Sequence, residues 1–280
     1  MAGRGVTRTR FAPSPTGLLH LGHAFSALIA ADMASPGEFL LRIEDIDRDR
    51  CKPEFEAAIF EDLAWLGLCW RQPVRRQSDR LEIYGDALDY LASLGVGYPC
   101  SCTRGDIRGA LSAPQEGAPV SGPDGLVYPG TCRGRAMREM REGDAIRLDA
   151  ARAFDLLGDD MLSFRDGGIH NLTRAAFQGG IGDVVLARRG MGTSYHLSVV
   201  IDDAAQGITL VSRGRDLFES TWIHVLLQRL LDLPTPDYHH HRLIRDDRGK
   251  RLAKRDDARS LRELRARGAT PADIRARVGL

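Results

Sequence analysis

The sequence predicts an α/β protein whose parallel sheet is interrupted by an insertion. From the N-terminus, strand-like and helix-like segments alternate in a β-α-β order, and this alternation returns in the second half of the chain. Between about Tyr98 and Arg135 the pattern breaks into a stretch rich in Gly, Pro, Ser and Cys, as expected of an insertion. At 280 residues, with 43% hydrophobic and 28% charged residues, the chain can bury a sizeable core.

Four elements are predicted in the first part of the chain. The run RTRFAP is short and extended, and His20 to Met33 is predicted to form a helix. The run EFLLRIEDID, which begins at Glu38, is a strand closed by acidic residues. Pro53 fits the first turn of a further helix, where its missing N–H costs no hydrogen bond. Four apolar residues recur behind it at helical spacing: Phe55, Ile59, Leu63 and Leu66.

Another helix is predicted to begin near SDRLEIY, where Asp79 and Glu82 have the spacing of a capping box. It ends at Gly95, because glycine accepts the left-handed conformation that closes many helices. One face of this helix carries its apolar side chains: Leu81, Tyr84, Leu88 and Leu91.

In the second half, GDVVLARRG and SYHLSVVIDD are both predicted as strands. Asp202 and Asp203 are then expected to end a strand and not to take part in chemistry. The run GITLVSRGRDL leads from a strand into a helix from about Leu217 to Leu231.

The formal net charge of +1 means that any nucleic-acid partner would need a local basic face. No apolar run of signal-peptide or membrane-spanning length follows the basic start MAGRGVTRTR, so a cytoplasmic location is expected.

Three of the five cysteines lie near one another, which favours metal binding over disulfides. Cys100 and Cys102 form a C-x-C pair, and Cys132 with the phenol of Tyr128 could complete a tetrahedral site. The alternative is three reduced cysteines in a loop. His239 to His241 of the run YHHHR, a rival metal site, are treated as non-ligands, because consecutive residues of an extended segment point to opposite sides.

The segment FAPSPTGLLHLGH places His20 and His23 on one face of a first helical turn. Unpaired backbone N–H groups and the helix dipole favour an anion there, and Gly22 would let a flat ring approach the backbone. These features point to a nucleoside triphosphate. The spacing of the histidines alone would favour a metal pair or ordinary surface residues, and the flanking prolines and glycines change that.

The segment RFAPSPTGLLHLGH resembles the HIGH-type signature of class I aminoacyl-tRNA synthetases, in the form carried by the glutamyl-tRNA synthetases. GKRLAKR resembles their KMSKS-type loop: Lys254 matches the second lysine, while Arg251 and Ala253 replace the first lysine and the serine. The resemblance implies a Rossmann-like catalytic core in which His20, His23 and Lys254 are catalytic. The same residues, with Gly22, would bind ATP and its Mg²⁺. Read without the family, GKRLAKR is a solvated basic stretch.

Other segments of the resemblance imply L-glutamate as the amino acid. LLRIEDIDRDR places the group that receives the substrate amine on Glu44, SYHLSVVIDD supplies Tyr195, and VSRGRDL supplies Arg213. An acid with two carboxylates and one ammonium suits two fixed guanidinium groups and one carboxylate. Taken singly, each arginine is more often a surface ion pair. The first signature adds a run of substrate-binding residues: Arg10, Phe11, Ala12, Pro13 and Ser14.

The cysteine segment YPCSC...YPGTC resembles the zinc-bearing segment of the short relatives of the glutamyl-tRNA synthetases. This implies one structural Zn²⁺ on Cys100, Cys102, Tyr128 and Cys132. The implied domains are residues 1–97 and 136–245 for two halves of the catalytic domain, 98–135 for the zinc-binding insertion, and 246–280 for the KMSKS-like loop and tail.

The short relatives lack an anticodon-binding domain, and because this chain ends at Leu280 none is expected here. The resemblance then implies a monomer that activates glutamate with ATP and transfers it to the queuosine base of tRNA(Asp). RNA contacts are expected from Arg133 to Arg141 and from Arg245 to Arg259. Three alternatives remain: a minimal glutamyl-tRNA synthetase charging a 3′ end, a paralogue that only binds glutamate or its adenylate, and a non-enzymatic nucleic-acid binder.

Overall fold

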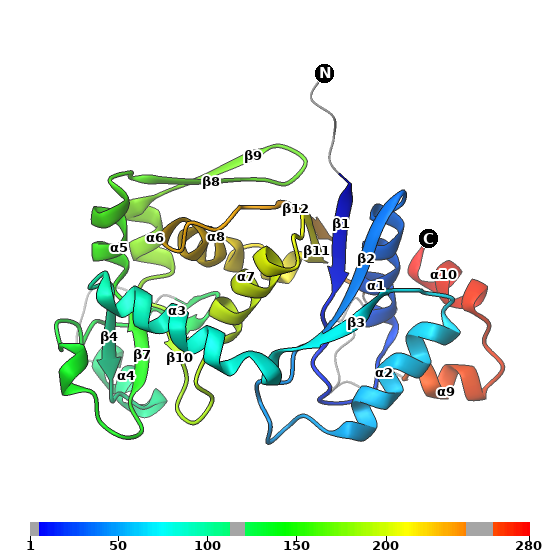
Figure 1. Cartoon of the computed structure of the whole chain (residues 1–280), viewed down its shortest axis with the longest axis horizontal. Helices are drawn as coiled ribbons and strands as arrows, with labels where there is room; N and C mark the ends of the chain where they lie inside the picture. The colour runs from blue at the N-terminus through cyan, green and yellow to red at the C-terminus, as the bar shows by residue number, and fades with distance from the viewer. Residues whose placement is uncertain (1–5, 113–120, 245–259) are drawn as a thin grey trace. The chain divides into compact units, whose positions relative to one another are not determined.

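The computed structural model describes residues 6–112, 121–244 and 260–280, which form two compact units (Figure 1). Unit 1 comprises Met1–Asp79, Gly207–Asp216 and Pro236–Leu280, and unit 2 comprises Arg80–Gln206 and Leu217–Thr235. Within the described parts of the chain, none of the helices is long and apolar enough to cross a membrane.

Unit 1 is built around parallel strands. Its elements are β1 (Thr7–Phe11), α1 (Leu21–Met33), β2 (Gly37–Ile43), α2 (Pro53–Trp65), β3 (Arg71–Arg76), β11 (Leu210–Gly214), β12 (Asp237–His241), α9 (Leu261–Ala266) and α10 (Pro271–Val278). Short 3-10 turns, η1 (Gln77–Arg80) and η3 (Arg215–Leu217), lie where the chain passes between units. β1, β2 and β3 pair in parallel in that order, and β11 pairs in parallel with β12. The predicted parallel sheet is therefore confirmed.

Strand β11 also runs beside β1. The N–H of Thr209 donates to the carbonyl of Arg8 at 3.0 Å, and two residues further along β1 the guanidinium of Arg10 donates to the carbonyl of Ser212 at 3.4 Å. From the first contact to the second, the residue numbers rise along both segments, as they do between neighbouring parallel strands. The carboxyl ends of β1, β2 and β11 thus lie at one edge, which is where open α/β sheets bind ligands.

Helix α1 packs closely against β1 because its inner face is made of small residues. Ala24, Ala27 and Ala30 are completely buried, and the hydroxyl of Thr9 on β1 donates to the carbonyl of Ala30 at 2.6 Å. The predicted helix boundaries are confirmed to within one residue, with His20 as the N-cap. Because α1 is held to the sheet along its length, its N-terminus is fixed at the carboxyl edge.

Helix α2 carries a buried carboxylate that is unfavourable in its charged form. Asp62 is 1% exposed, and its Oδ2 has no hydrogen-bond partner among the described residues. Burial raises the pKa of Asp62 to about 6, although the nearby guanidinium groups of Arg262 and Arg265 on α9 act to lower it. Above that pH the protein holds a charge in a place that favours the neutral acid.

We therefore expect Asp62→Asn to stabilise the protein in a pH-dependent way. Since the folded-state pKa of Asp62 lies above the unfolded value, its favourable contribution is complete near pH 4 and is lost as the pH rises through 6. The variant should gain about 2 kcal/mol in free energy of unfolding at pH 7.5 and almost nothing at pH 4. Urea denaturation at both pH values is the measurement.

Glu61→Gln is the matched control for this prediction. Glu61 lies on the same helix, is 53% exposed through its side chain, and pairs with Arg262 at 3.4 Å and Arg265 at 3.0 Å. Removing these surface ion pairs should cost at most about 1 kcal/mol and should not stabilise the protein at pH 7.5. An Asp62→Asn gain that is equal at both pH values would show that the buried charge is not its cause.

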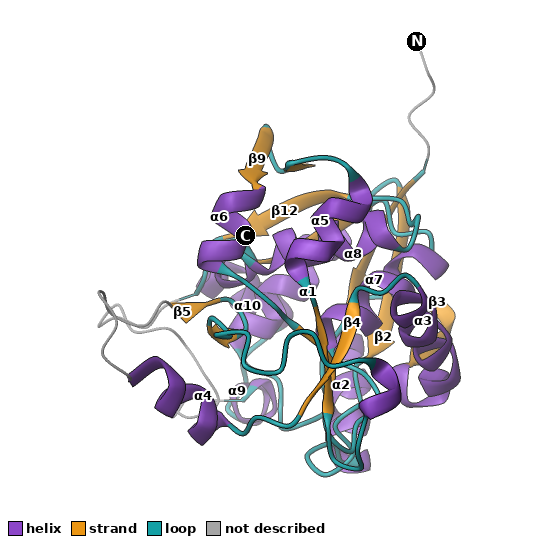
Figure 2. Ribbon diagram, turned by 90° about the vertical axis from the view of Figure 1, so that its left-hand side faces the viewer, coloured by secondary structure: helices purple, strands orange, loops and turns teal. Residues whose placement is uncertain are grey.

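Unit 2 contains an antiparallel sheet, a hairpin and several helices. Its elements are α3 (Leu81–Ser93), β4 (Gly97–Cys100), α4 (Arg104–Ser112), β5 (Ser121–Gly122), β6 (Gly125–Leu126), η2 (Met137–Glu139), β7 (Ala145–Leu148), α5 (Ala150–Leu157), β8 (Met161–Arg165), β9 (Ile169–Thr173), α6 (Arg174–Gly180), β10 (Val185–Ala187), α7 (Tyr195–Ala205) and α8 (Ser220–Leu230). Strand β7 lies between β4 and β10, and β8 pairs with β9. Figures 1 and 2 both show α4 at the periphery of this unit.

The prediction that SYHLSVVIDD is a strand is wrong, because the segment forms α7. Ser194 caps the helix by accepting from the N–H of Leu197 at 3.4 Å. Asp202 therefore does not end a strand: it is completely buried in α7 and accepts from Arg80 Nε at 2.8 Å and from the Tyr84 hydroxyl at 2.7 Å. A helix buried on all sides lacks a polar stripe, so its β-branched run has the pattern of a buried strand.

Helix α3 has the predicted apolar face but not the predicted cap. Its N-cap is Arg80, which makes no side-chain capping hydrogen bond, and Asp79 lies in the preceding 3-10 turn. The chain enters the helix from that turn, so the capping-box spacing of Asp79 and Glu82 is not used. The end is as predicted: Gly95 is left-handed with φ +74°, and the N–H of Val96 returns to the carbonyl of Leu91 at 3.3 Å.

Candidate functional site

The two histidines of the first signature lie together at the start of α1. The N–H of Gly22 donates to His20 Nδ1 at 3.1 Å, and the N–H of His20 donates to His23 Nδ1 at 3.2 Å. The rings stack with centroids 3.8 Å apart. Because each Nδ1 accepts a backbone hydrogen bond, the proton of each neutral ring is on Nε2, the nitrogen that can donate to a ligand.

Gly22 is required by this stacked pair. A Cβ on Gly22 would lie 3.0 Å from Cε1 of His20, tighter than most real contacts. The absence of a side chain thus keeps the His20 ring in its capping position and leaves the backbone of the first turn open on that side.

Lys254, Arg251 and Ala253 lie outside the described residues, so the role of Lys254 stays a prediction. The described residues on both sides of that stretch belong to the core that includes α1. Ser260 forms an isolated antiparallel bridge with His20, and the N–H of Leu261 donates to the carbonyl of Leu19 at 2.8 Å. Ile244, on the other side, is 8% exposed in the same core.

Arg10, Glu44 and Arg213 come from β1, from the end of β2 and from β11. Both arginines are 5% exposed. The backbone N–H of Glu44 donates to the carbonyl of Pro13 at 3.0 Å, which ties the end of β2 to the segment that follows β1. The structure therefore brings all three charged residues to neighbouring strands of unit 1.

Sequence reasoning missed the residues that orient two of these three, Glu44 and Arg213. The completely buried Arg42 forms an ion pair with Glu44, with Nη2 and Oε1 3.3 Å apart. His240 on β12 lies opposite Arg213 in the strand register, and the two are joined by a 3.1 Å hydrogen bond between Nε and Nε2. The ring of Tyr238 lies 5.3 Å from the Arg213 guanidinium. The one sequence signal for these contacts with Arg213 is that Tyr238 and His240 are two residues apart, which places them on the same face of a strand.

The remaining residues of the glutamate prediction are less informative. Phe11 and Pro13 are buried, Ala12 is half-buried, and Ser14 is exposed with its carbonyl accepting from the N–H of Thr16 at 2.8 Å. Tyr195 is the first residue of α7 in unit 2, half-buried, and its ring contacts those of two histidines. Its predicted contact with glutamate stays a prediction.

The cysteines of the insertion converge as a metal site requires. The sulfur atoms of Cys100, Cys102 and Cys132 all lie within 4.8 Å of one another. The Tyr128 hydroxyl is 3.4 Å from the sulfur of Cys100 and 3.3 Å from that of Cys102, and it accepts from the N–H of Cys132 at 2.8 Å. Three sulfurs and one phenol oxygen thus surround a common point, which fits a tetrahedral ion.

The surroundings of the cluster shift the pKa values of two of its thiols in opposite directions. Burial acts to raise the pKa of the Cys132 thiol, but hydrogen bonds from Tyr128 and the Ser101 backbone favour the thiolate and lower the pKa to about 6. Burial raises the pKa of Cys102 to about 11, so in the absence of a cation this thiol stays protonated at neutral pH. Arg147 covers the site, with its guanidinium 4.0 Å from the Tyr128 ring centre and its Nε donating to the sulfur of Cys100 at 3.4 Å.

Comparison with known proteins places these features in a family. The family described as tRNA synthetases class I (E and Q), catalytic domain, matches residues 6–279. A protein of Rhodobacter capsulatus named Glutamyl-Q tRNA(Asp) synthetase is 60% identical over 97% of this chain and 99% of its own. One of Nitratidesulfovibrio vulgaris with the same name is 40% identical over 96% of this chain and 84% of its own.

A solved structure shares the fold. The glutamate-tRNA synthetase of Elizabethkingia anophelis superposes with a TM-score of 0.75 and 26% identity. The match covers 95% of this chain but 59% of that chain.

Proposed function

The chain belongs to the glutamate and glutamine family of class I tRNA synthetases, and from this premise we propose that it activates L-glutamate with ATP and transfers it to the queuosine base of tRNA(Asp). The observation that carries the proposal is the near full-length match to relatives named Glutamyl-Q tRNA(Asp) synthetase. The charged residues at the carboxyl edge of unit 1 support glutamate as the amino acid.

In the first step the α-carboxylate of glutamate attacks the α-phosphorus of Mg²⁺-bound ATP, and pyrophosphate leaves. Arg10 and Arg213 receive the two carboxylates, and Glu44, oriented by Arg42, receives the ammonium group. His20 and His23 donate through Nε2 to the phosphates, where negative charge builds up in the transition state. Lys254 contributes a further positive charge to the departing pyrophosphate.

In the second step a hydroxyl of the queuosine cyclopentenediol attacks the carbonyl of the mixed anhydride. An ester forms, AMP leaves, and the hydroxyl proton passes to solvent. No protein nucleophile is needed, since the adenylate is already activated and the enzyme has only to hold the reactants in place.

The cysteine cluster is proposed to bind one structural Zn²⁺ through Cys100, Cys102, Tyr128 and Cys132. When bound, the ion would join segments of the insertion that are far apart in the sequence. With four protein ligands there is no position for an activated water, so the metal takes no part in ester formation.

Labelled glutamate tests the proposed function directly. Incubation with ATP and tRNA(Asp) carrying queuosine should give labelled RNA, and the label should survive removal of the terminal adenosine. The reason is that the acceptor is a base in the anticodon and not the 3′ end.

Two RNA controls accompany this experiment. Neither tRNA(Asp) lacking queuosine nor tRNA(Glu) should become labelled. If label appeared on the 3′ end, or equally on tRNA without queuosine, the chain would be a minimal glutamyl-tRNA synthetase and the proposed acceptor would be wrong.

A further inference from the structure

A cavity of about 570 Å³ opens in unit 2 next to the cysteine cluster. Its volume falls within the range of about 300–1,000 Å³ that is common for small-molecule sites. Cys102 is one of its lining residues, and α4 supplies another part of the wall. Nothing in the glutamylation steps uses this cavity.

The cavity is strongly cationic. Its described lining contains five arginines and two aspartates, an excess of three positive charges. Two of the arginines, Arg104 and Arg108, are four residues apart on α4 and thus lie on the same face of that helix. The full set of charged residues is Arg104, Arg108, Arg147, Arg188, Arg189, Asp124 and Asp183.

Part of this charge is not neutralised by carboxylates. Arg189 donates through Nη2 to the carbonyls of Ser101 and Cys102, contacts that leave its positive charge in place. Arg104 is exposed and makes no hydrogen bond or ion pair with the residues that the structure describes. Arg188 has a looser partner, with Nη2 3.6 Å from Asp124 Oδ1.

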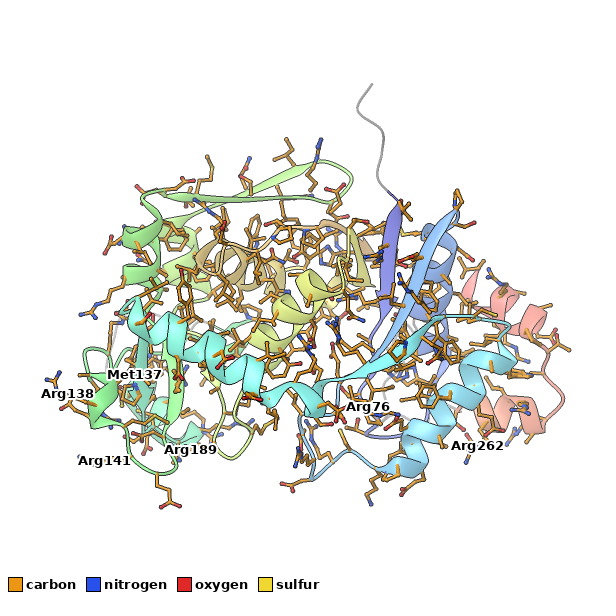
Figure 3. The ribbon with its side chains drawn as sticks, in the orientation of Figure 1. Arg76, Met137, Arg138, Arg141, Arg189 and Arg262 are labelled. Carbon is orange, nitrogen blue, oxygen red and sulfur yellow. The ribbon has the colours of Figure 1, made fainter. Side chains whose placement is uncertain are left out.

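Unlike Arg104 and Arg189, the first arginines of the basic run predicted to contact RNA form ion pairs with carboxylates. Arg133 is bound to the buried Asp183 at 2.8 Å, and Arg135 is bound to Asp144 at the same distance. These two guanidinium groups therefore form ion pairs inside unit 2. Figure 3 labels Arg138, Arg141 and Arg189 at the end of unit 2 that carries α4.

The cavity wall also has an apolar part. Ile107, Leu126, Ile181 and Met191 line it beside the arginines. Cations next to apolar side chains suit a nucleotide, whose phosphate needs charge and whose base needs an apolar surface to pack on. An inorganic anion would need only the cations.

We propose that this cavity binds one phosphate-linked nucleotide of the RNA substrate, with the phosphodiester on Arg104 and Arg108 and the base against the apolar wall. The inference rests on the proposed function, which supplies the RNA. It adds a second point of RNA contact, in unit 2, that is separate from the residues that activate glutamate.

The test measures RNA affinity and glutamate activation in parallel on the full-length protein. The probe is a fluorescein-labelled RNA hairpin with the anticodon-arm sequence of tRNA(Asp), followed by anisotropy at several salt concentrations. Arg104→Gln/Arg108→Gln should bind it about tenfold more weakly near 0.15 M salt. The slope of log affinity against log salt should fall by about 1, because the contact with one phosphodiester is lost.

Two variants keep this test specific. Arg104→Lys/Arg108→Lys should restore most of the affinity and the slope, since a phosphate accepts a lysine ammonium. Arg165→Gln removes an exposed arginine of β8 that does not line the cavity, and it should bind like the wild type.

ATP–pyrophosphate exchange with glutamate, measured without RNA, should be unchanged in all variants. Unchanged RNA affinity and slope in the double glutamine variant, with exchange retained, would overturn the cavity proposal and leave the proposed function standing. A raised KM for ATP would also overturn it, because the cavity would then serve the free nucleotide. Failure of the proposed function would instead appear as wild-type protein without exchange or queuosine-dependent labelling.

Discussion

Arg213→Gln should lower kcat/KM for glutamate in ATP–pyrophosphate exchange by at least about a hundredfold, since a buried charge contact to substrate is worth about 3 kcal/mol. The substitution keeps a polar side chain of similar length but removes the charge. A carboxylate taken from water into a buried site depends strongly on such a partner.

The structure explains why this arginine is suited to hold a carboxylate. Its guanidinium is fixed on one side by the hydrogen bond to His240 and lies over Tyr238, so little conformational entropy is lost when the substrate binds. Arg213→Lys should therefore recover only part of the loss, leaving kcat/KM about tenfold below the wild type, because an ammonium cannot form the two parallel hydrogen bonds of a guanidinium.

Arg71→Gln is the control for this prediction. Arg71 lies on β3 of the same unit, but its side chain is 60% exposed and pairs with Glu38 at 2.9 Å. Its exchange kinetics should match those of the wild type. If Arg213→Gln keeps the wild-type melting temperature and also the wild-type kcat/KM, Arg213 does not bind the substrate.

The fold was predictable where local pattern and tertiary structure agree. The helix predicted from His20 to Met33 matches α1 to within one residue, and the parallel strands follow from their alternation with helices. The α7 segment could not be recognised, because burial on all sides removes the periodicity that distinguishes a helix from a strand.

The sequence predicted the charged residues of the candidate site but not the residues that orient them. Family resemblance selected Arg213 and Glu44 by their order in the sequence. Their orienting partners, His240 and Arg42, depend on strand register and burial, which no local pattern encodes. Nothing in the sequence indicated that Arg133, in the basic run, is bound to a buried aspartate, and the RNA contacts of that run stay a prediction.

Cys132→Ala should abolish zinc binding. Wild-type protein purified without added zinc should carry about one equivalent of the metal, and the variant less than about a tenth, because one of the three thiolates, the strongest ligands of the site, is lost. Inductively coupled plasma mass spectrometry gives the metal content.

The same variant should also lose stability, because the metal-binding energy becomes folding energy when the ligands come from distant segments. Cys100 and Cys132 are far apart in the sequence, with α4, β5 and β6 between them, and the four donor atoms are brought together only in the folded insertion. The melting temperature should fall by at least about 5 °C. A chelator such as 1,10-phenanthroline should lower that of the wild type in the same way, which keeps the test informative if the variant folds poorly.

Cys69→Ala is the matched control, since Cys69 is an exposed cysteine of unit 1 outside the cluster. It should retain the metal and the wild-type melting temperature. Tyr128→Phe separates the fourth ligand from the other three: the phenol oxygen is lost while the buried ring under Arg147 is kept, so zinc should remain but exchange with a competing chelator much faster. Full zinc occupancy in Cys132→Ala would contradict the assignment of the cluster, and zinc release from Tyr128→Phe at the wild-type rate would remove the tyrosine from the ligand set.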